Sequence, residues 1–283
     1  MIYRFLKKTL GLLRRIARRL TREIHCFFRR GNVKYRGMIL PIASMRWEMC
    51  GREYASDKYF LESGCAEARR VVSKMGFTRT QRIVEIGSGL GRFATGLLHE
   101  VGEVEYWGFD TARTWVQWCQ RHIEKNHPTF RFIHIDVENE LYNPTGAVAG
   151  EAFRFPLPDA HADIVYMWGV FTNMRLKDAR NYVAEMSRMT RDGGRIFLTA
   201  FVEENVPEET VNPVGYVDYT CECPLHVVRY EQSALFEIFK RYSLTIENFS
   251  HHGGCHCNQS EIYLHKDCSL GLRRIKGTGA YTG

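Results

Sequence analysis

The 283-residue sequence lacks the long apolar run that a membrane-spanning helix requires. Charged residues interrupt each apolar stretch before it reaches the roughly 20 residues that cross a bilayer. No apolar segment of signal-peptide length opens the chain, and its nine cysteines are an odd number, so a secreted disulfide framework is not expected. We therefore expect a cytoplasmic protein with reduced thiols.

Most of the chain also lacks excess positive charge, although the formal net charge is +7. Residues 1–36 hold twelve lysines and arginines and one acid, so this segment carries +11 and the remainder −4. A mildly negative body offers no basic groove, so we expect no nucleic-acid partner. Internal repeats are absent as well, and a content of 45% hydrophobic and 13% aromatic residues suffices for one large folded domain.

The basic segment has apolar residues at every third or fourth position from Ile2 to Phe27. This spacing predicts a basic amphipathic helix. Three roles remain open for it: binding of an anionic membrane surface through residues 1–30, packing on the body or a partner, and mitochondrial targeting. The first role would place the protein peripherally at the inner membrane surface.

The most informative motif is residues 82–92, which read Arg-Ile-Val-Glu-Ile-Gly-Ser-Gly-Leu-Gly-Arg. An apolar run suited to a buried parallel strand is followed by three glycines at alternate positions and then by a helical segment. Glycines at such a turn let the backbone approach a ligand without an intervening Cβ. The spacing disfavours the dinucleotide fingerprint, which needs a small residue at the position of Arg92.

Residues 84–91 resemble the first motif of class I S-adenosylmethionine-dependent methyltransferases. Matches to the family's next strands follow in order at residues 105–110, 130–136, 162–169 and 191–198. The resemblance implies S-adenosylmethionine as cofactor. It also implies an α/β fold with a doubly wound, seven-stranded, mostly parallel sheet, helices on both faces and an antiparallel last strand.

The resemblance further implies which residues contact the cofactor. Asp110 would hold the ribose hydroxyls, Asp136 would lie beside adenine, and Glu85 would order the glycine turn or bind the cofactor's amino group. Asp110 could instead cap a helix, and Asp136 could be a turn residue. The expected contacts are Glu85, Gly87, Ser88, Gly89, Gly91, Asp110, Thr111, Asp136, Val137, Trp168 and Gly169.

The methyl acceptor is less apparent from the sequence. Residues 168–174 resemble a subgroup of small-molecule and glycan methyltransferases in which a histidine commonly stands at the position of Asn173. Asparagine cannot act as a general base, so another residue, an acidic acceptor or positioning alone would have to suffice. The candidate bases are His226, His251, His252, His256 and Glu261, and none is assigned a catalytic role.

We expect an oxygen acceptor on a small molecule, a glycan or a lipid-linked substrate. Two other functions remain open. One is a non-catalytic cofactor-binding module that docks a partner or membrane, and the other is a nicotinamide-dependent oxidoreductase.

Cysteines and histidines gather near residues 221–226 and 251–257. These are zinc-ligand types, but Cys221 and Cys223 are closer together than the cysteines of usual structural zinc sites. We therefore expect no bound metal.

The sequence suggests a division into segments. Residues 1–36 form the basic helical extension, 37–76 a helical cap over the cofactor, 77–267 the methyltransferase domain and 268–283 a flexible tail. The connection 202–229 is long and contains three prolines, which favours a lid over a plain surface loop.

Overall fold

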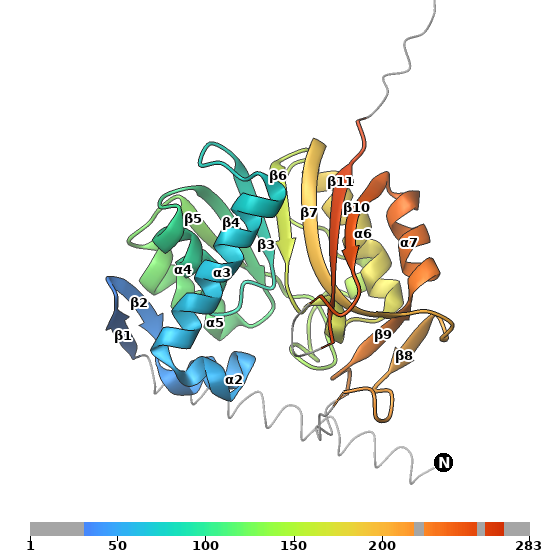
Figure 1. Ribbon diagram of the computed structural model, residues 1–283. Helices are drawn as coiled ribbons and strands as arrows, with labels where there is room; N and C mark the ends of the chain where they lie inside the picture. Colours follow the sequence, from blue (N-terminus) through green and yellow to red (C-terminus); the bar gives the residue numbers. More distant parts are fainter. Residues whose placement is uncertain (1–30, 218–223, 254–257, 269–283) are drawn as a thin grey trace, which may run out of the picture.

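The computed structural model describes residues 31–217, 224–253 and 258–268 (Figure 1). The predicted basic helix of residues 1–30 lies outside these ranges, as do Cys221, Cys223, residues 255–257 and almost all of the predicted tail. Within the described ranges, none of the helices combines the length and apolar composition that a bilayer crossing requires.

A mixed β-sheet forms the centre of the protein, and its main path runs β10-β11-β7-β6-β3-β4-β5 (Figure 1). These strands are β3 (Arg82–Ile86), β4 (Glu105–Asp110), β5 (Phe130–His134), β6 (Ala162–Met167), β7 (Thr190–Glu203), β10 (Leu244–Ser250) and β11 (Ser260–Lys266). The five strands from β3 to β7 are parallel to one another, whereas β11 is antiparallel to both β7 and β10. The predicted doubly wound α/β sheet is confirmed.

Helices bury both faces of the sheet (Figure 1). They are α3 (Asp57–Met75), α4 (Arg92–Glu100), α5 (Arg113–Cys119), α6 (Leu176–Met189) and α7 (Gln232–Arg241). On β6, Ile164 and Tyr166 join the core under α3, α4 and α5, while Val165 and Met167 join the core under α6 and α7. Because both faces are buried, the strands read as continuous apolar runs.

Helices α3 and α4 cross at two glycines. A Cβ on Gly64 would lie 2.2 Å from the carbonyl oxygen of Arg92, and one on Gly96 would lie 2.1 Å from the carbonyl oxygen of Gly64. No side chain fits at either position without separating the helices. This contact fixes the start of α4 and therefore the end of the glycine turn that precedes it.

The structure differs from the predicted helical cap at residues 37–76. Its start belongs to a hairpin of β1 (Asn32–Tyr35) and β2 (Met38–Pro41), which are antiparallel. Arg36 and Gly37 both have positive φ, as a two-residue hairpin turn requires. Of the helical part, α2 (Ala43–Cys50) lies against the glycine turn, whereas α3 belongs to the helix layer beside the sheet.

The predicted lid contains regular structure that extends the sheet. β7 continues to Glu203, where it pairs in parallel with β9 (Val228–Glu231), and β9 pairs antiparallel with β8 (Glu209–Val211). These two short strands bring the sheet to nine strands. Both ends of the segment are therefore anchored, while residues 218–223 lie outside the described part.

Candidate functional site

The glycine turn after β3 adopts a backbone conformation that favours glycine. Gly87, Gly89 and Gly91 have φ angles of +82°, +52° and +72°. Neighbouring side chains also approach closely, because a Cβ on Gly87 would lie 2.4 Å from Val170 and one on Gly89 would lie 2.5 Å from the sulfur of Met49. The turn thus needs glycine both for its conformation and for its packing.

Asp110, the last residue of β4, holds this turn in place. Its Oδ2 accepts a hydrogen bond of 2.7 Å from the backbone N–H of Gly89, and its Oδ1 accepts one of 2.7 Å from Ala112. Burial raises the pKa of Asp110 to about 6, against the effect of these backbone donors. A carboxylate offers about four acceptor positions, so the two bonds leave capacity for ligand hydroxyls.

Glu85 is buried on β3, with 5% of its surface exposed, and accepts a hydrogen bond from the Tyr106 hydroxyl. Burial raises the pKa of Glu85 to about 8, although the Tyr106 hydroxyl and the Arg92 charge oppose this shift. Burial thus favours the protonated form of Glu85 over the carboxylate. A ligand ammonium group nearby would favour the ionised carboxylate.

Side chains of α2 lie directly over the glycine turn. The Met49 sulfur accepts a hydrogen bond of 2.9 Å from the backbone N–H of Leu90. Cys50 lies within electrostatic range of Arg92 and Asp110, and burial raises the pKa of its thiol to about 11. A cavity of about 240 Å³ between β2 and α4 contains no residue of the turn. Helix α2 thus contacts the turn at Gly89 and Leu90.

Arg92 is a site residue that the sequence did not assign. It begins α4, and its guanidinium lies 5.9 Å from the centre of the Tyr54 ring. Burial acts against its charge, but nearby Tyr166 and Glu67 hold the pKa of Arg92 above its usual value. Within the described residues, its side chain forms no ion pair or hydrogen bond, so it is available to an anionic ligand group.

Asp136 follows β5 and faces its own loop. Its Oδ1 accepts a hydrogen bond of 2.9 Å from the Asn143 amide, which lowers the pKa of Asp136. The backbone of Val148 also donates to the Asp136 carbonyl at 3.1 Å, and Val137 is buried beside it. The Asp136 side chain is thus bonded to Asn143 in its own loop. The turn role of Asp136 and the contact of Asp136 and Val137 with adenine both stay predictions.

Trp168 and Gly169 follow β6. Gly169 has a φ of +68°, and a Cβ there would meet nothing within 4 Å, so the space beside it is open. Its backbone N–H donates to the Thr199 hydroxyl at 2.8 Å. The Arg70 guanidinium lies 5.4 Å from the centre of the Trp168 ring and pairs with Glu261 at 2.6 Å. The candidate base Glu261 is therefore engaged in an ion pair.

Asn173 joins residues 202–229, the segment predicted to be a lid, to the rest of the domain. Its amide donates to the carbonyl oxygens of Leu225 at 2.9 Å and His226 at 2.6 Å, and its Oδ1 accepts a hydrogen bond of 3.0 Å from the Thr172 hydroxyl. The side chain is 8% exposed. The amide nitrogen has two hydrogens and can donate one to each carbonyl, whereas a histidine ring nitrogen carries at most one. This difference gives the asparagine a structural reason.

The candidate bases occupy different places. His226 lies in the segment 202–229 next to Asn173, and burial lowers the pKa of its imidazole. His251 and His252 instead contact Glu203 at the end of β7. His256 lies outside the described residues.

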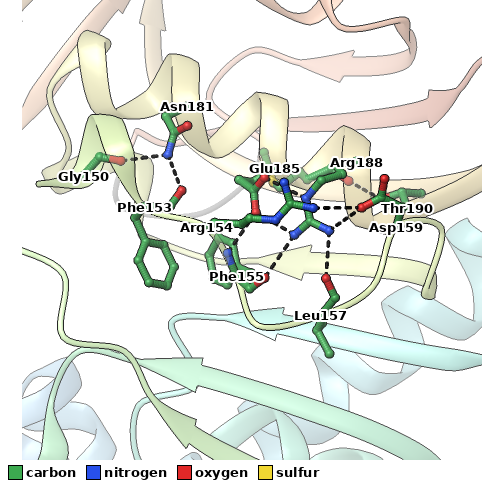
Figure 2. Close-up of polar contacts among 11 residues, drawn as sticks. Gly150, Phe153, Arg154, Phe155, Leu157, Asp159, Asn181, Glu185, Arg188 and Thr190 are labelled. Carbon is green, nitrogen blue, oxygen red and sulfur yellow. Dashed lines mark hydrogen bonds and ion pairs between the residues drawn. The ribbon is translucent and has the colours of Figure 1, made fainter. Parts of the chain in front are cut away.

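Arg188 on α6 fastens the loop before β6, another feature that the sequence did not assign (Figure 2). Its five N–H groups donate to the carbonyls of Phe155 and Leu157 and to the carboxylates of Asp159 and Glu185, at 2.7–3.1 Å. Phe155 in turn packs edge-on against Phe109, with ring centres 5.2 Å apart. Through Phe155, the network therefore packs against Phe109 of β4, the residue before Asp110.

Comparison with known proteins agrees with this fold. Residues 84–198 match the model of the methyltransferase domain family. The fold resembles a protein of Haloferax volcanii described as a methyltransferase, solved with the Trm112 methyltransferase activator (TM-score 0.55, 14% identity, 78% of this chain and 96% of that chain). It also resembles the glycopeptide N-methyltransferase MtfA complexed with S-adenosylmethionine (TM-score 0.52, 13% identity, 72% and 94%).

A third similar structure is the cyclase SpnF (TM-score 0.50, 13% identity, 72% of this chain and 80% of that chain). At these identities the structural matches establish the fold alone. The reaction must therefore be argued from the residues of the site.

Proposed function

We propose that this chain, whose residues 84–198 match the methyltransferase domain family, is a class I S-adenosylmethionine-dependent methyltransferase that transfers a methyl group to an oxygen of a small-molecule, glycan or lipid-linked acceptor. The observation that carries the proposal is the glycine turn held by Asp110 where β3 and β4 end. In open α/β sheets, ligands bind at the carboxyl ends of the strands, and this turn lies there.

The cofactor would use the polar groups of this edge. The remaining acceptor positions of the Asp110 carboxylate would bind the ribose hydroxyls. Glu85, in its ionised form, would bind the amino group of the cofactor. Arg92 would bind the cofactor carboxylate, because its guanidinium lies over the Tyr54 ring and forms no hydrogen bond or ion pair within the described residues, although the Glu67 charge acts on it. The open space beside Gly169 would receive the methionine portion.

Methyl transfer from a sulfonium is an in-line displacement. The acceptor oxygen forms a bond to the methyl carbon as the bond from carbon to sulfur breaks, which leaves neutral S-adenosylhomocysteine and releases the acceptor's proton. Positioning alone can lower such a barrier by about 7 kcal/mol or more. The lid, fastened through Asn173, would supply that positioning, and His226 is the candidate base that lies in it.

The charge of residues 1–36 supports the lipid-linked class of acceptor. This segment carries +11, and each basic residue near an anionic membrane contributes about 1 kcal/mol of attraction. A peripheral position at the membrane would bring the domain close to a lipid-linked substrate.

Methyl transfer can be tested with S-adenosylmethionine labelled in its methyl group and a panel of hydroxyl-bearing glycans, lipid-linked sugars and small phenols. The proposal expects label in one acceptor class together with equimolar S-adenosylhomocysteine. The matched control is D110N, which should bind the cofactor poorly. Binding of the cofactor without transfer to any acceptor would favour the non-catalytic module.

A further inference from the structure

Three potential metal ligands meet beyond the carboxyl end of β7. Glu203 is the last residue of that strand, and His251 and His252 directly follow β10. One ligand atom from each side chain lies within 4.8 Å of the other two. The two imidazole rings stack with their centres 3.8 Å apart, so both present a nitrogen to the same carboxylate.

The distances in this cluster are close to those of a metal site. The Nε2 atom of His252 lies 2.8 Å from Oε1 of Glu203, and the Nε2 atom of His251 lies 3.1 Å from Oε2. Two zinc ligands with bonds of about 2.0–2.1 Å in tetrahedral geometry are separated by about 3.3 Å. The Nε2 atom of His251 also lies 3.1 Å from the carbonyl oxygen of Val202, so the ion would displace this contact as well as the two hydrogen-bonded pairs.

The surroundings of Glu203 are compatible with a cation. The Tyr216 hydroxyl donates to its Oε1 at 2.7 Å and so orients the carboxylate. The guanidinium of Arg229 lies 5.2 Å from the centre of the Tyr216 ring and forms no ion pair with Glu203. The carboxylate thus has polar support but no competing positive side chain within ion-pair distance in the described ranges.

We infer that Glu203, His251 and His252 form a binding site for a zinc ion. Two imidazole nitrogens and one carboxylate oxygen are ligands that zinc commonly takes, and three protein ligands leave a fourth tetrahedral position open. This inference departs from the sequence prediction that the chain binds no metal, and it does not depend on the proposed methyl transfer.

A second cluster serves as a contrast. Cys65, His99 and Glu100 also place ligand atoms within 4.8 Å of one another. Arg69, however, pairs with Glu100 at 2.9 Å, and burial raises the pKa of the Cys65 thiol to about 12. A guanidinium beside a protonated thiol disfavours a cation, so this cluster provides a control.

The proposed site connects to the candidate methyltransferase site through direct contacts. A Cβ on Gly253, which follows His252, would lie 2.5 Å from Cγ of Glu261. Glu261 pairs with Arg70, which lies against the Trp168 ring. Zinc at Glu203, His251 and His252 would therefore join the ends of β7 and β10. This junction would lie next to Glu261, which contacts Arg70 beside the Trp168 ring.

The test measures zinc in the full chain. The protein is stripped with a chelator, incubated with zinc chloride, passed through a desalting column and analysed for metal content. We expect the wild type to retain about one more equivalent of zinc per chain than E203Q or the double variant H251Q/H252Q. The controls H265Q and C65S should keep it, since His265 lies in an unrelated pair with Asp267 at 3.1 Å.

Folding is checked by cooperative thermal unfolding of each variant. Cobalt absorption of the wild type provides a measurement that needs no variant: tetrahedral bands without a thiolate charge-transfer band support the proposed ligands. A thiolate band, equal zinc in E203Q and the wild type, or no zinc uptake by the wild type would overturn the inference.

Discussion

The carboxylate of Asp110 accepts a hydrogen bond of 2.7 Å from the backbone N–H of Gly89, and this bond joins the end of β4 to the turn after β3. The two residues are 21 positions apart in the chain, yet they form one ligand-binding edge. Because the same carboxylate can accept ribose hydroxyls, it would both shape the turn and bind the cofactor.

Replacing Asp110 with Asn should weaken S-adenosylmethionine binding by about 10- to 100-fold, because hydrogen bonds to a charged group contribute about 1.5–3 kcal/mol. Titration calorimetry of the folded variant measures this loss. The control is D163N. Asp163 contacts Arg191 and the backbone of Arg82, and it lies at the start of β6, away from the carboxyl end of the strands. Equal affinity of D110N and the wild type would mean that the ribose binds elsewhere.

Glu85 should make the stability of the ligand-free protein depend on pH. Its pKa is raised from 4.5 to about 8 on folding, so the folded state holds the proton more tightly. The free energy of unfolding should therefore fall as pH rises from about 4.5 to about 8. Urea unfolding across this range should show a shallower fall for E85Q than for the wild type.

The control for this measurement is E237Q, an exposed position on α7. Its pH dependence should match that of the wild type. If E85Q and the wild type show parallel curves, the Glu85 carboxyl does not titrate as its burial indicates.

Asn173 should affect the acceptor more than the cofactor. N173D replaces the amide that donates to Leu225 and His226 with a carboxylate facing two carbonyls. An unsatisfied buried polar group costs about 1–3 kcal/mol, so kcat/KM for the acceptor should fall by about 10- to 100-fold. Affinity for S-adenosylmethionine, measured by calorimetry, should change less than about twofold on this argument.

A matched control for Asn173 is N126D, which removes an exposed amide bond to the carbonyl of His122. It should leave both quantities unchanged. A loss of cofactor affinity in N173D equal to its loss in kcat/KM would contradict the role of Asn173 as a fastener of the lid.

Arg188 should be a determinant of stability. R188K loses the planar fork that donates to Phe155, Leu157 and Glu185, and breaking such a partly buried pair costs about 2–4 kcal/mol. Urea unfolding measures this loss. R180K is the control, because Arg180 is exposed and lies 3.9 Å from Glu208, so its change should be below about 0.5 kcal/mol. Equal stabilities of the two variants would contradict the network in Figure 2.

The basic N-terminal segment gives a separate prediction. Deletion of residues 1–30 should reduce sedimentation with anionic liposomes and leave cofactor affinity intact, because ten of the twelve basic residues of the extension lie there. Neutral liposomes are the control. Equal sedimentation of the truncated and full chains would remove the membrane proposal.

The sheet could be predicted from the sequence because its strands are buried on both faces. Ile83, Val84 and Ile86 form an apolar run regardless of what packs on them, and the turn that follows has a defined glycine spacing. Strands β8 and β9 were missed, since they are short and lie in a proline-containing segment whose pattern is not periodic.

The polar fasteners could not be predicted in the same way. Asn173 donates to two backbone carbonyls, and Arg188 donates to two others besides its carboxylate partners. Every residue has such a carbonyl, and the partners lie up to 53 positions away. Nothing in the side chains of Leu225 or Phe155 identifies them as partners. Arg92 was recognised only as a mismatch to the dinucleotide fingerprint, because its place beside Tyr54 arises from the packing of α4.

The central claim is that the turn held by Asp110 binds S-adenosylmethionine. It is tested most directly by calorimetric titration of the full chain with S-adenosylmethionine, S-adenosylhomocysteine and NADH in parallel. We predict saturable binding of the first two with a stoichiometry of about one and no heat from NADH, as the glycine spacing indicates. Binding of NADH alone would contradict the account and assign the turn to a dinucleotide.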